Sequence, residues 1–146
     1  MTEARIYLDA NVFIYAIEGS PEVAESLRRL FELFRRKRGA GVTSELTLAE
    51  VLPKATTAQR RMYLDLIVWS RVFDLQPVSR EVLVETADNR RVAQMPKLPD
   101  AIHVVTAIRA GCRTVPSADS RLKLPEGLRA HLPDSASVSR IVQELS

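Results

Sequence analysis

Short apolar runs alternate along this chain with longer segments in which apolar residues recur every three or four positions. The short runs are residues 6–8, 41–43, 72–75 and 114–115. Their length is typical of buried β-strands, and the segments between them are long enough for helices. The alternation predicts an α/β fold, a three-layer α/β/α sandwich with a mostly parallel sheet of four or five strands. Residues 137–145 are expected to add a last short strand or helix.

Residues that favour helix ends mark the helical segments. The predicted helices are residues 12–19, 21–39, 44–53, 60–71, 79–87 and 99–110. Pro21 suits a first helical turn, and Ser44 and Ser79 are good N-cap residues. Gly111 ends the last helix, because glycine readily adopts the left-handed conformation that follows a helix.

Length and composition fit a single domain over residues 1–146, since 46% of the residues are hydrophobic and can form one core. The lone cysteine, Cys112, excludes an internal disulfide. No secretory leader and no apolar run of about 18 residues stands out, so we expect a cytoplasmic protein without membrane contact. Lys and Arg number 21 against 18 Asp and Glu, a formal net charge of +3 that suits a polyanionic partner without requiring one.

Four acidic residues stand inside apolar runs or at their ends, namely Asp9, Glu50, Asp100 and Asp119. Parallel α/β sheets bind ligands beyond the carboxyl ends of their strands, where Asp9 and Asp119 fall. Carboxylates are ligands that Mg²⁺ prefers, and a bound cation supplies the hydroxide and the charge compensation that phosphodiester hydrolysis needs. Two unit charges about 6 Å apart repel by roughly 3 kcal/mol at an effective dielectric of about 20. Four converging carboxylates would therefore indicate a metal-dependent nuclease, but their spacing alone does not bring them together.

Three of these acids also have a simpler structural interpretation. Asp9 and Asp100 stand where acidic side chains cap a helix or complement its dipole. Glu50 stands among apolar residues, where an unpaired carboxylate would be costly, and its simpler interpretation is a place on the exposed face of its helix.

Three polar residues near the acids have similar alternatives. Asn11 and Ser44 would cap helices, a role that is compatible with supporting a site nearby. His103 follows Asp100 by one helical turn. We interpret His103 as a hydrogen-bonded packing residue in preference to a contact with the scissile phosphate or a base.

Surface features suggest partners without identifying them. Basic clusters, which either contact an RNA backbone or keep helix ends solvated, are residues 28–29, 35–38, 60–61 and 90–91. An apolar surface for protein partners is expected from Leu30, Phe31, Phe34 and residues 64–73.

Four segments, in this order along the chain, resemble the motifs of the PIN-domain family. They are LDANVFIYA (residues 8–16), TSELTLAEV (43–51), DAIHVVTA (100–107) and SAD (117–119). Within that family, the single-domain size and the form of these motifs are most similar to the VapC toxins of bacterial and archaeal toxin–antitoxin pairs. Two features depart from the family pattern. Ser117 stands where Thr is more common, and residues 116–118 replace the usual Thr-Asn-Asp style of turn.

The resemblance implies a metal-dependent endoribonuclease with a PIN-like fold. Its metal ligands and catalytic residues would be Asp9, Glu50, Asp100 and Asp119, which would hold one or two Mg²⁺ or Mn²⁺ ions. Metal-activated water would cleave the phosphodiester and leave a 5′-phosphate and a 3′-hydroxyl. The supporting residues would be Asn11, Ser44, Ser117 and His103.

The resemblance also implies partners. A toxin of this type would cut a structured RNA such as a transfer RNA or a ribosomal loop, would be blocked by an antitoxin protein, and would form a homodimer. Two alternatives stay open at this point. One is a catalytically idle PIN-like module that binds RNA, DNA or protein, and the other is a PIN nuclease of ribosomal RNA maturation or DNA repair.

Overall fold

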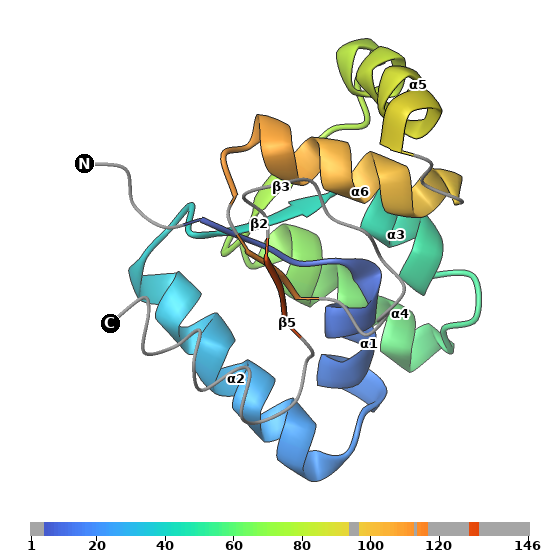
Figure 1. Cartoon of the computed structure of the whole chain (residues 1–146). Helices are drawn as coiled ribbons and strands as arrows, with labels where there is room; N and C mark the ends of the chain where they lie inside the picture. Colours follow the sequence, from blue (N-terminus) through green and yellow to red (C-terminus); the bar gives the residue numbers. More distant parts are fainter. Residues whose placement is uncertain (1–4, 94–96, 113, 117–128, 132–146) are drawn as a thin grey trace.

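Five parallel strands form one sheet at the centre of the molecule (Figure 1). The computed structural model describes residues 5–93, 97–112, 114–116 and 129–131. Its strands are β1 (Ile6–Tyr7), β2 (Gly41–Ser44), β3 (Asp74–Gln76), β4 (Thr114–Pro116) and β5 (Arg129–His131), in the order β3-β2-β1-β4-β5. The predicted parallel sheet is confirmed. The third strand begins two residues later than predicted, and the predicted element at 137–145 lies outside the described residues.

Helices cover both faces of this sheet. They are α1 (Ala10–Glu18), α2 (Pro21–Arg36), α3 (Leu46–Val51), α4 (Thr57–Leu64), the π-helix η1 (Asp65–Trp69), α5 (Arg80–Ala93) and α6 (Leu98–Arg109). The first pair, α1 and α2, packs with α4 and η1 on one face, whereas α6 covers the other face and carries α5 on its outer side (Figure 1). This arrangement confirms the three-layer α/β/α sandwich. No helix in the described ranges is long and apolar enough to span a membrane.

The larger core lies between the sheet and the layer of α1, α2, α4 and η1. Four phenylalanine rings meet there, and Phe73 contacts Phe13 and Phe31 edge to face with ring centroids 5.1 and 5.2 Å apart. Leu30 and Phe34 are fully buried in this core, so the prediction that they form an exposed partner surface is wrong. Phe31 is 7% exposed. The apolar stripe of α2 faces inward because the sheet behind it offers the apolar surface that the stripe must cover.

A smaller core lies on the other face of the sheet, and successive side chains of the central strand β1 enter the two cores in turn. Ile6 and Leu8 pack in the larger core, whereas Tyr7 packs on the opposite side with Val42, on the face covered by α6. The ladder continues past the strand, since the Leu8 N–H donates to the Val42 carbonyl at 2.8 Å. With successive side chains pointing to opposite faces, Asp9 follows Tyr7 on the α6 side of the sheet.

Several helix boundaries differ from the sequence prediction. Helix α1 begins at Ala10 with Asp9 as its N-cap, so Asn11 is an exposed residue inside the helix and not a cap. Helix α4 begins earlier than predicted because Thr56 and Gln59 form a capping box. That Thr-x-x-Gln signal is present in the sequence and the prediction missed it.

The segment predicted as one helix over 60–71 changes geometry near its end. The chain passes from α4 into one π-helical turn, η1, where the Ser70 hydroxyl donates to the Leu66 carbonyl at 2.6 Å. Arg71 then adopts a left-handed φ of 57° and ends the segment. Trp69, the single tryptophan of the sequence, is 67% exposed and lies on the surface.

Gly41 allows α2 to pack closely against β2. A Cβ at this position would lie 2.8 Å from the Phe34 ring, which is itself buried. We predict that Gly41→Ala lowers the free energy of unfolding by about 1–3 kcal/mol, because the core would be overpacked. Urea denaturation of Gly41→Ala, Phe34→Leu and the double variant measures this. The double variant should lose less than the sum of the single losses, and additive losses would contradict the contact.

Cys112 is a buried thiol in the smaller core. Burial raises its pKa to about 12, while Arg5 lowers it and Asp74 raises it by smaller amounts. A pKa about three units above the ordinary value leaves roughly a thousandfold less thiolate at neutral pH. We therefore expect iodoacetamide to alkylate the folded protein at least about 100-fold more slowly than the urea-unfolded chain. Equal rates in the two states would show that the thiol is accessible.

Candidate functional site

The strand order reverses at β1, which has β2 on one side and β4 on the other. In open parallel sheets the ligand crevice lies beyond the carboxyl ends of the strands at such a reversal. Asp9 follows β1 at this edge, and Ser44 is the last residue of β2. The last residue of β4 is Pro116, directly before Ser117 in the sequence. The topology therefore identifies the carboxyl edge around β1 as the candidate site.

Asp9 has a clear structural role at this edge. Its carboxylate is buried, with 9% of the residue exposed, and Oδ1 accepts a hydrogen bond from the Val12 N–H at 3.3 Å. The predicted capping role is thus confirmed. A bond of 3.3 Å is long for this type, and a cap can share its carboxylate with a ligand at the same edge.

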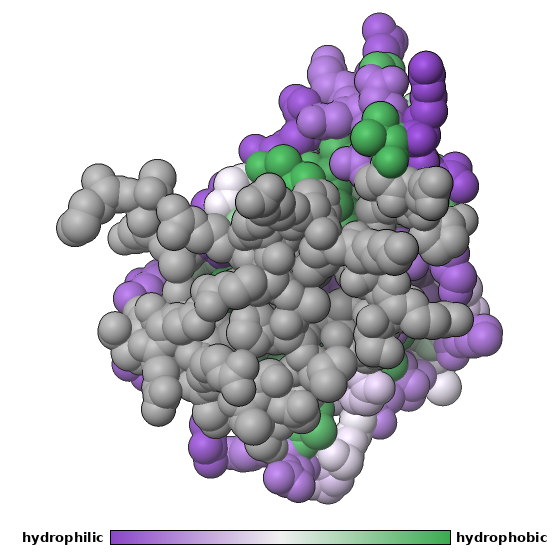
Figure 2. Space-filling view, viewed as in Figure 1, coloured by the Kyte–Doolittle hydropathy of each residue, from purple (hydrophilic) through white to green (hydrophobic). Residues whose placement is uncertain are grey.

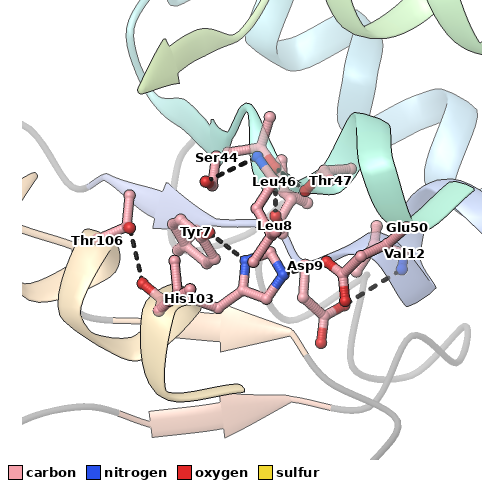
Figure 3. Close-up of polar contacts among 12 residues, drawn as sticks. Tyr7, Leu8, Asp9, Val12, Ser44, Leu46, Thr47, Glu50, His103 and Thr106 are labelled. Carbon is pink, nitrogen blue, oxygen red and sulfur yellow. Dashed lines mark hydrogen bonds and ion pairs between the residues drawn. The ribbon is translucent and has the colours of Figure 1, made fainter. Parts of the chain in front are cut away.

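Glu50 and His103 meet across the site from two different helices. His103 Nε2 lies 2.5 Å from Glu50 Oε1, although the residues are 53 positions apart in the sequence. The histidine side chain is 6% exposed and that of the glutamate 29%, so the contact runs from the interior to the surface. Figure 3 shows the Asp9 and Glu50 carboxylates directed toward the same region, next to the His103 ring.

Tyr7 contacts the other nitrogen of the His103 ring. Its hydroxyl lies 2.5 Å from His103 Nδ1, and the two rings meet edge to face with centroids 5.6 Å apart. Burial holds the pKa of Tyr7 well above its ordinary value; the charges of Asp9 and Glu50 raise it further, and a hydrogen bond with Ser44 lowers it. Both carboxylates therefore act electrostatically on the same buried phenol.

The protonation pattern follows from these partners. With a Glu50 carboxylate oxygen as the acceptor, this hydrogen bond requires a hydrogen on His103 Nε2. Tyr7 keeps its proton because its pKa is raised, and its O–H donates to Nδ1. The chain of donors runs from Tyr7 through His103 to Glu50 and uses both nitrogens of the ring. His103 is thus a hydrogen-bonded buried residue, as predicted, and it also contacts one of the predicted metal ligands.

The other predicted site residues occupy different positions. Asp100 lies partly buried in the first turn of α6, one turn before His103. Ser44 is fully buried, and its hydroxyl accepts from the Leu46 N–H at 3.0 Å, so it supports the start of α3. Ser117 and Asp119 lie outside the described residues.

Sequence analysis missed three residues that build the site. Besides Tyr7, these are Thr43 and Thr47, which are both fully buried. The Thr43 hydroxyl donates to the Leu8 carbonyl at 2.7 Å and lies 2.9 Å from the Thr47 hydroxyl, which ties the end of β1 to β2 and α3. The available signal was the alternation of the strand, which places Tyr7 on the same face as Asp9.

The donors at this edge suit a hard divalent cation. Asp9 and Glu50 carry carboxylate oxygens, the ligand type that Mg²⁺ and Mn²⁺ accept. Two carboxylates directed to one region repel each other when both are ionised, and a bound cation would relieve that repulsion. Within the described part of the chain, no group of three or more His, Cys, Asp or Glu side chains is arranged to hold a metal ion. Asp9 and Glu50 are therefore the candidate ligands that the described residues bring to this edge.

Comparison with known proteins identifies the family and the fold. Residues 6–127 match the PIN-domain model. VapBC2 from Rickettsia felis, solved with a promoter DNA fragment, superposes with a TM-score of 0.65 at 23% identity and covers 87% of this chain and 98% of its own. DNA-bound VapBC from Salmonella typhimurium gives 0.62 at 19% identity, with 89% and 98% covered. VapC20 of Mycobacterium tuberculosis, a toxin that cleaves the sarcin-ricin loop, gives 0.62 at 15% identity, with 80% and 91% covered.

These structural similarities, all below 25% identity, establish a common fold. No curated protein sequence matches the chain at a significant level. The predicted resemblance is nevertheless confirmed by the family match, and structures of VapBC and VapC proteins have the same fold. Because the match spans residues 6–127, well over half of the 146 residues, the chain belongs to the PIN-domain family.

Proposed function

We propose that this protein is a Mg²⁺- or Mn²⁺-dependent endoribonuclease that acts as the toxin of a toxin–antitoxin pair. Its family and the VapC-type proteins that share its fold support a nuclease, and hence a hydrolase. The observation that carries the finer proposal is the pair of carboxylates, Asp9 and Glu50, at the strand-order reversal. The whole chain would then act as one PIN-like domain.

The proposed metal ligands are Asp9, Glu50, Asp100 and Asp119. Asp100 qualifies because it stands one turn from His103, whose ring touches Glu50. Asp119 qualifies by sequence, three residues after β4 ends at the same edge of the sheet. A divalent cation held there would supply an attacking hydroxide and compensate the charge that builds on phosphate. Asn11, at the exposed start of α1, and Ser117 are proposed to orient the substrate or a ligand.

The topology separates the basic clusters into those near the site and those far from it. Helix α2 leads into the amino end of β2, so residues 35–38 lie at the edge of the sheet opposite to Asp9 (Figure 1). Helix α4 begins soon after α3 at the carboxyl edge, which places exposed Arg60 and Arg61 on the side of the site. We propose that Arg60 and Arg61 contact the RNA backbone.

Two apolar features provide candidate surfaces for protein partners. A groove of about 410 Å³ between α1, α2 and the α4–η1 segment is lined by Ala16, Phe31, Met62 and Leu66, with Arg28 and Arg35 among its charged residues. We propose that an antitoxin segment with apolar anchors binds there. The second feature lies on the outer layer, where Figure 2 shows apolar atoms among hydrophilic ones near α5. Exposed apolar residues of α5 and α6, proposed for a homodimer interface, are Leu83, Val84, Val92, Leu98 and Ile108.

The nuclease proposal is tested by incubating purified, antitoxin-free protein with total bacterial RNA and Mn²⁺, followed by sequencing of new 5′-phosphate ends. We expect discrete ends that disappear with EDTA and in Asp9→Asn. Asparagine is as good an N-cap as aspartate, so this variant keeps α1 capped while it removes the charge. Loss of activity should be at least about 100-fold.

The matched control is Glu25→Gln, which removes an exposed carboxylate on α2 that pairs only with Arg28 among the contacts described. It should cut like the wild type. Folded wild-type protein that produces no new ends, or cleavage that persists equally in EDTA and Asp9→Asn, would contradict a metal-dependent nuclease and favour a binding module.

The RNA surface is tested by charge reversal. Arg60→Glu with Arg61→Glu should raise the KM for RNA by about tenfold or more, because contacts with phosphate would be replaced by repulsion. The matched variant, Arg35→Glu with Arg36→Glu, changes the same charge at the opposite edge and should alter KM much less. Equal effects of the two pairs would show that the interaction is not localised near α4.

A further inference from the structure

The Glu50 carboxylate is held by a buried pair of side chains that ordinary metal binding does not require. Tyr7 is fully buried and His103 is 5% exposed. Their hydrogen bonds nevertheless form a series that runs from the Tyr7 hydroxyl through the His103 ring to Glu50 Oε1 (Figure 3). Glu50 stands near the end of α3, a helix of only six residues. Its long side chain would have several rotamers open to it without such contacts.

We propose that Tyr7 and His103 are positioning residues that fix Glu50 through Oε1, so that Oε2 is directed to the cation and substrate. This inference rests on the proposed metal-dependent nuclease. Neither residue touches substrate in this scheme. Both nitrogens of the His103 ring are already engaged, and the ring is almost completely covered.

The anchoring end of the pair is rigid. Tyr7 belongs to the central strand and packs with Val42 and Ala107, so its hydroxyl has little freedom to move. His103 lies in α6 among buried neighbours on the same helix. The two rings also meet edge to face. The Glu50 end, which is partly exposed, is therefore tied to the central strand and to a largely buried helix.

Packing alone does not account for this arrangement. A leucine at 103 and a phenylalanine at 7 would fill similar volumes without burying any polar atom, and burial of polar atoms is favourable only when they are paired. Here each buried polar atom has its partner, and the series ends at a carboxylate on the functional edge. Groups that hold a metal ligand in this way typically change metal affinity or activity by about 10- to 100-fold when they are removed.

The test compares three variants of the full chain. Tyr7→Phe removes one hydroxyl and keeps the ring. His103→Leu removes both hydrogen bonds, and His103→Gln keeps an N–H donor for Glu50. The first measurement is the Mn²⁺ dissociation constant, obtained from the electron paramagnetic resonance of free Mn²⁺, and the second is thermal unfolding in EDTA. The third is kcat and KM for RNA cleavage.

We expect His103→Leu to weaken Mn²⁺ binding by about 10- to 100-fold and to lower kcat with little change in KM. Tyr7→Phe should show a smaller loss in the same direction, and His103→Gln should recover part of the loss seen in His103→Leu. The matched control is Thr86→Val, which removes a buried hydroxyl from α5 that donates to the Val82 carbonyl. It should leave the Mn²⁺ dissociation constant unchanged.

The outcomes separate the two proposals. Wild type that binds Mn²⁺ and cuts RNA, with folded Tyr7→Phe and His103→Gln variants that bind Mn²⁺ equally well, would overturn the positioning role and leave the nuclease intact. Wild type that neither binds Mn²⁺ nor cuts RNA would overturn both. If His103→Leu unfolds in EDTA, the Mn²⁺ dissociation constants of Tyr7→Phe and Thr86→Val decide whether the positioning role holds. Each of these two variants loses one buried hydroxyl, but only Tyr7→Phe loses it beside His103.

Discussion

The structure depends on the two-sided burial of the central strand β1. It pairs with β2 on one side and β4 on the other, and its alternating side chains enter the two separate cores. A strand covered on both faces has no freedom of register, since a shift by one residue would exchange Ile6 with Tyr7. The same constraint determines where the chain emerges at Asp9, so the position of the first site carboxylate follows from the packing of the core.

At the amino edge of the sheet, the side chain of Arg5 links several elements. Arg5 donates to the Gly39 carbonyl at 3.0 Å and to the Ala110 carbonyl at 2.6 Å, and it forms an ion pair with Asp74. These contacts join the amino end of β1 to the residues before β2, to the end of α6 and to β3. Arg5 thus has a structural role at the amino edge of the sheet, and the candidate site lies at the opposite, carboxyl edge.

Nearly all buried polar side-chain atoms in the described part of the chain have hydrogen-bond partners. Thr43, Thr47, Thr86 and Thr106 all have hydrogen-bond partners, and within the described part of the chain only Asn89 Oδ1 is buried without one. Each such group would destabilise the core if it lacked a partner. Beside β1 and α3, Thr43 bonds with Thr47 and the Leu8 carbonyl, and His103 bonds with Tyr7 and Glu50.

The sequence by itself determined the layer architecture, since the apolar runs of β1 and β2 and the helical periodicity of α2 depend on local pattern alone. It also identified Asp9 and Glu50 as candidates. It could not determine that His103 meets both Glu50 and Tyr7, because those contacts join residues 53 and 96 positions apart and arise only when α6 crosses the sheet. Leu30 shows the same limit, because an amphipathic stripe has one pattern whether it faces a partner or the protein's own core. Only the tertiary structure determined that the stripe of α2 faces the protein's own core, because packing against the sheet removes its apolar surface from water.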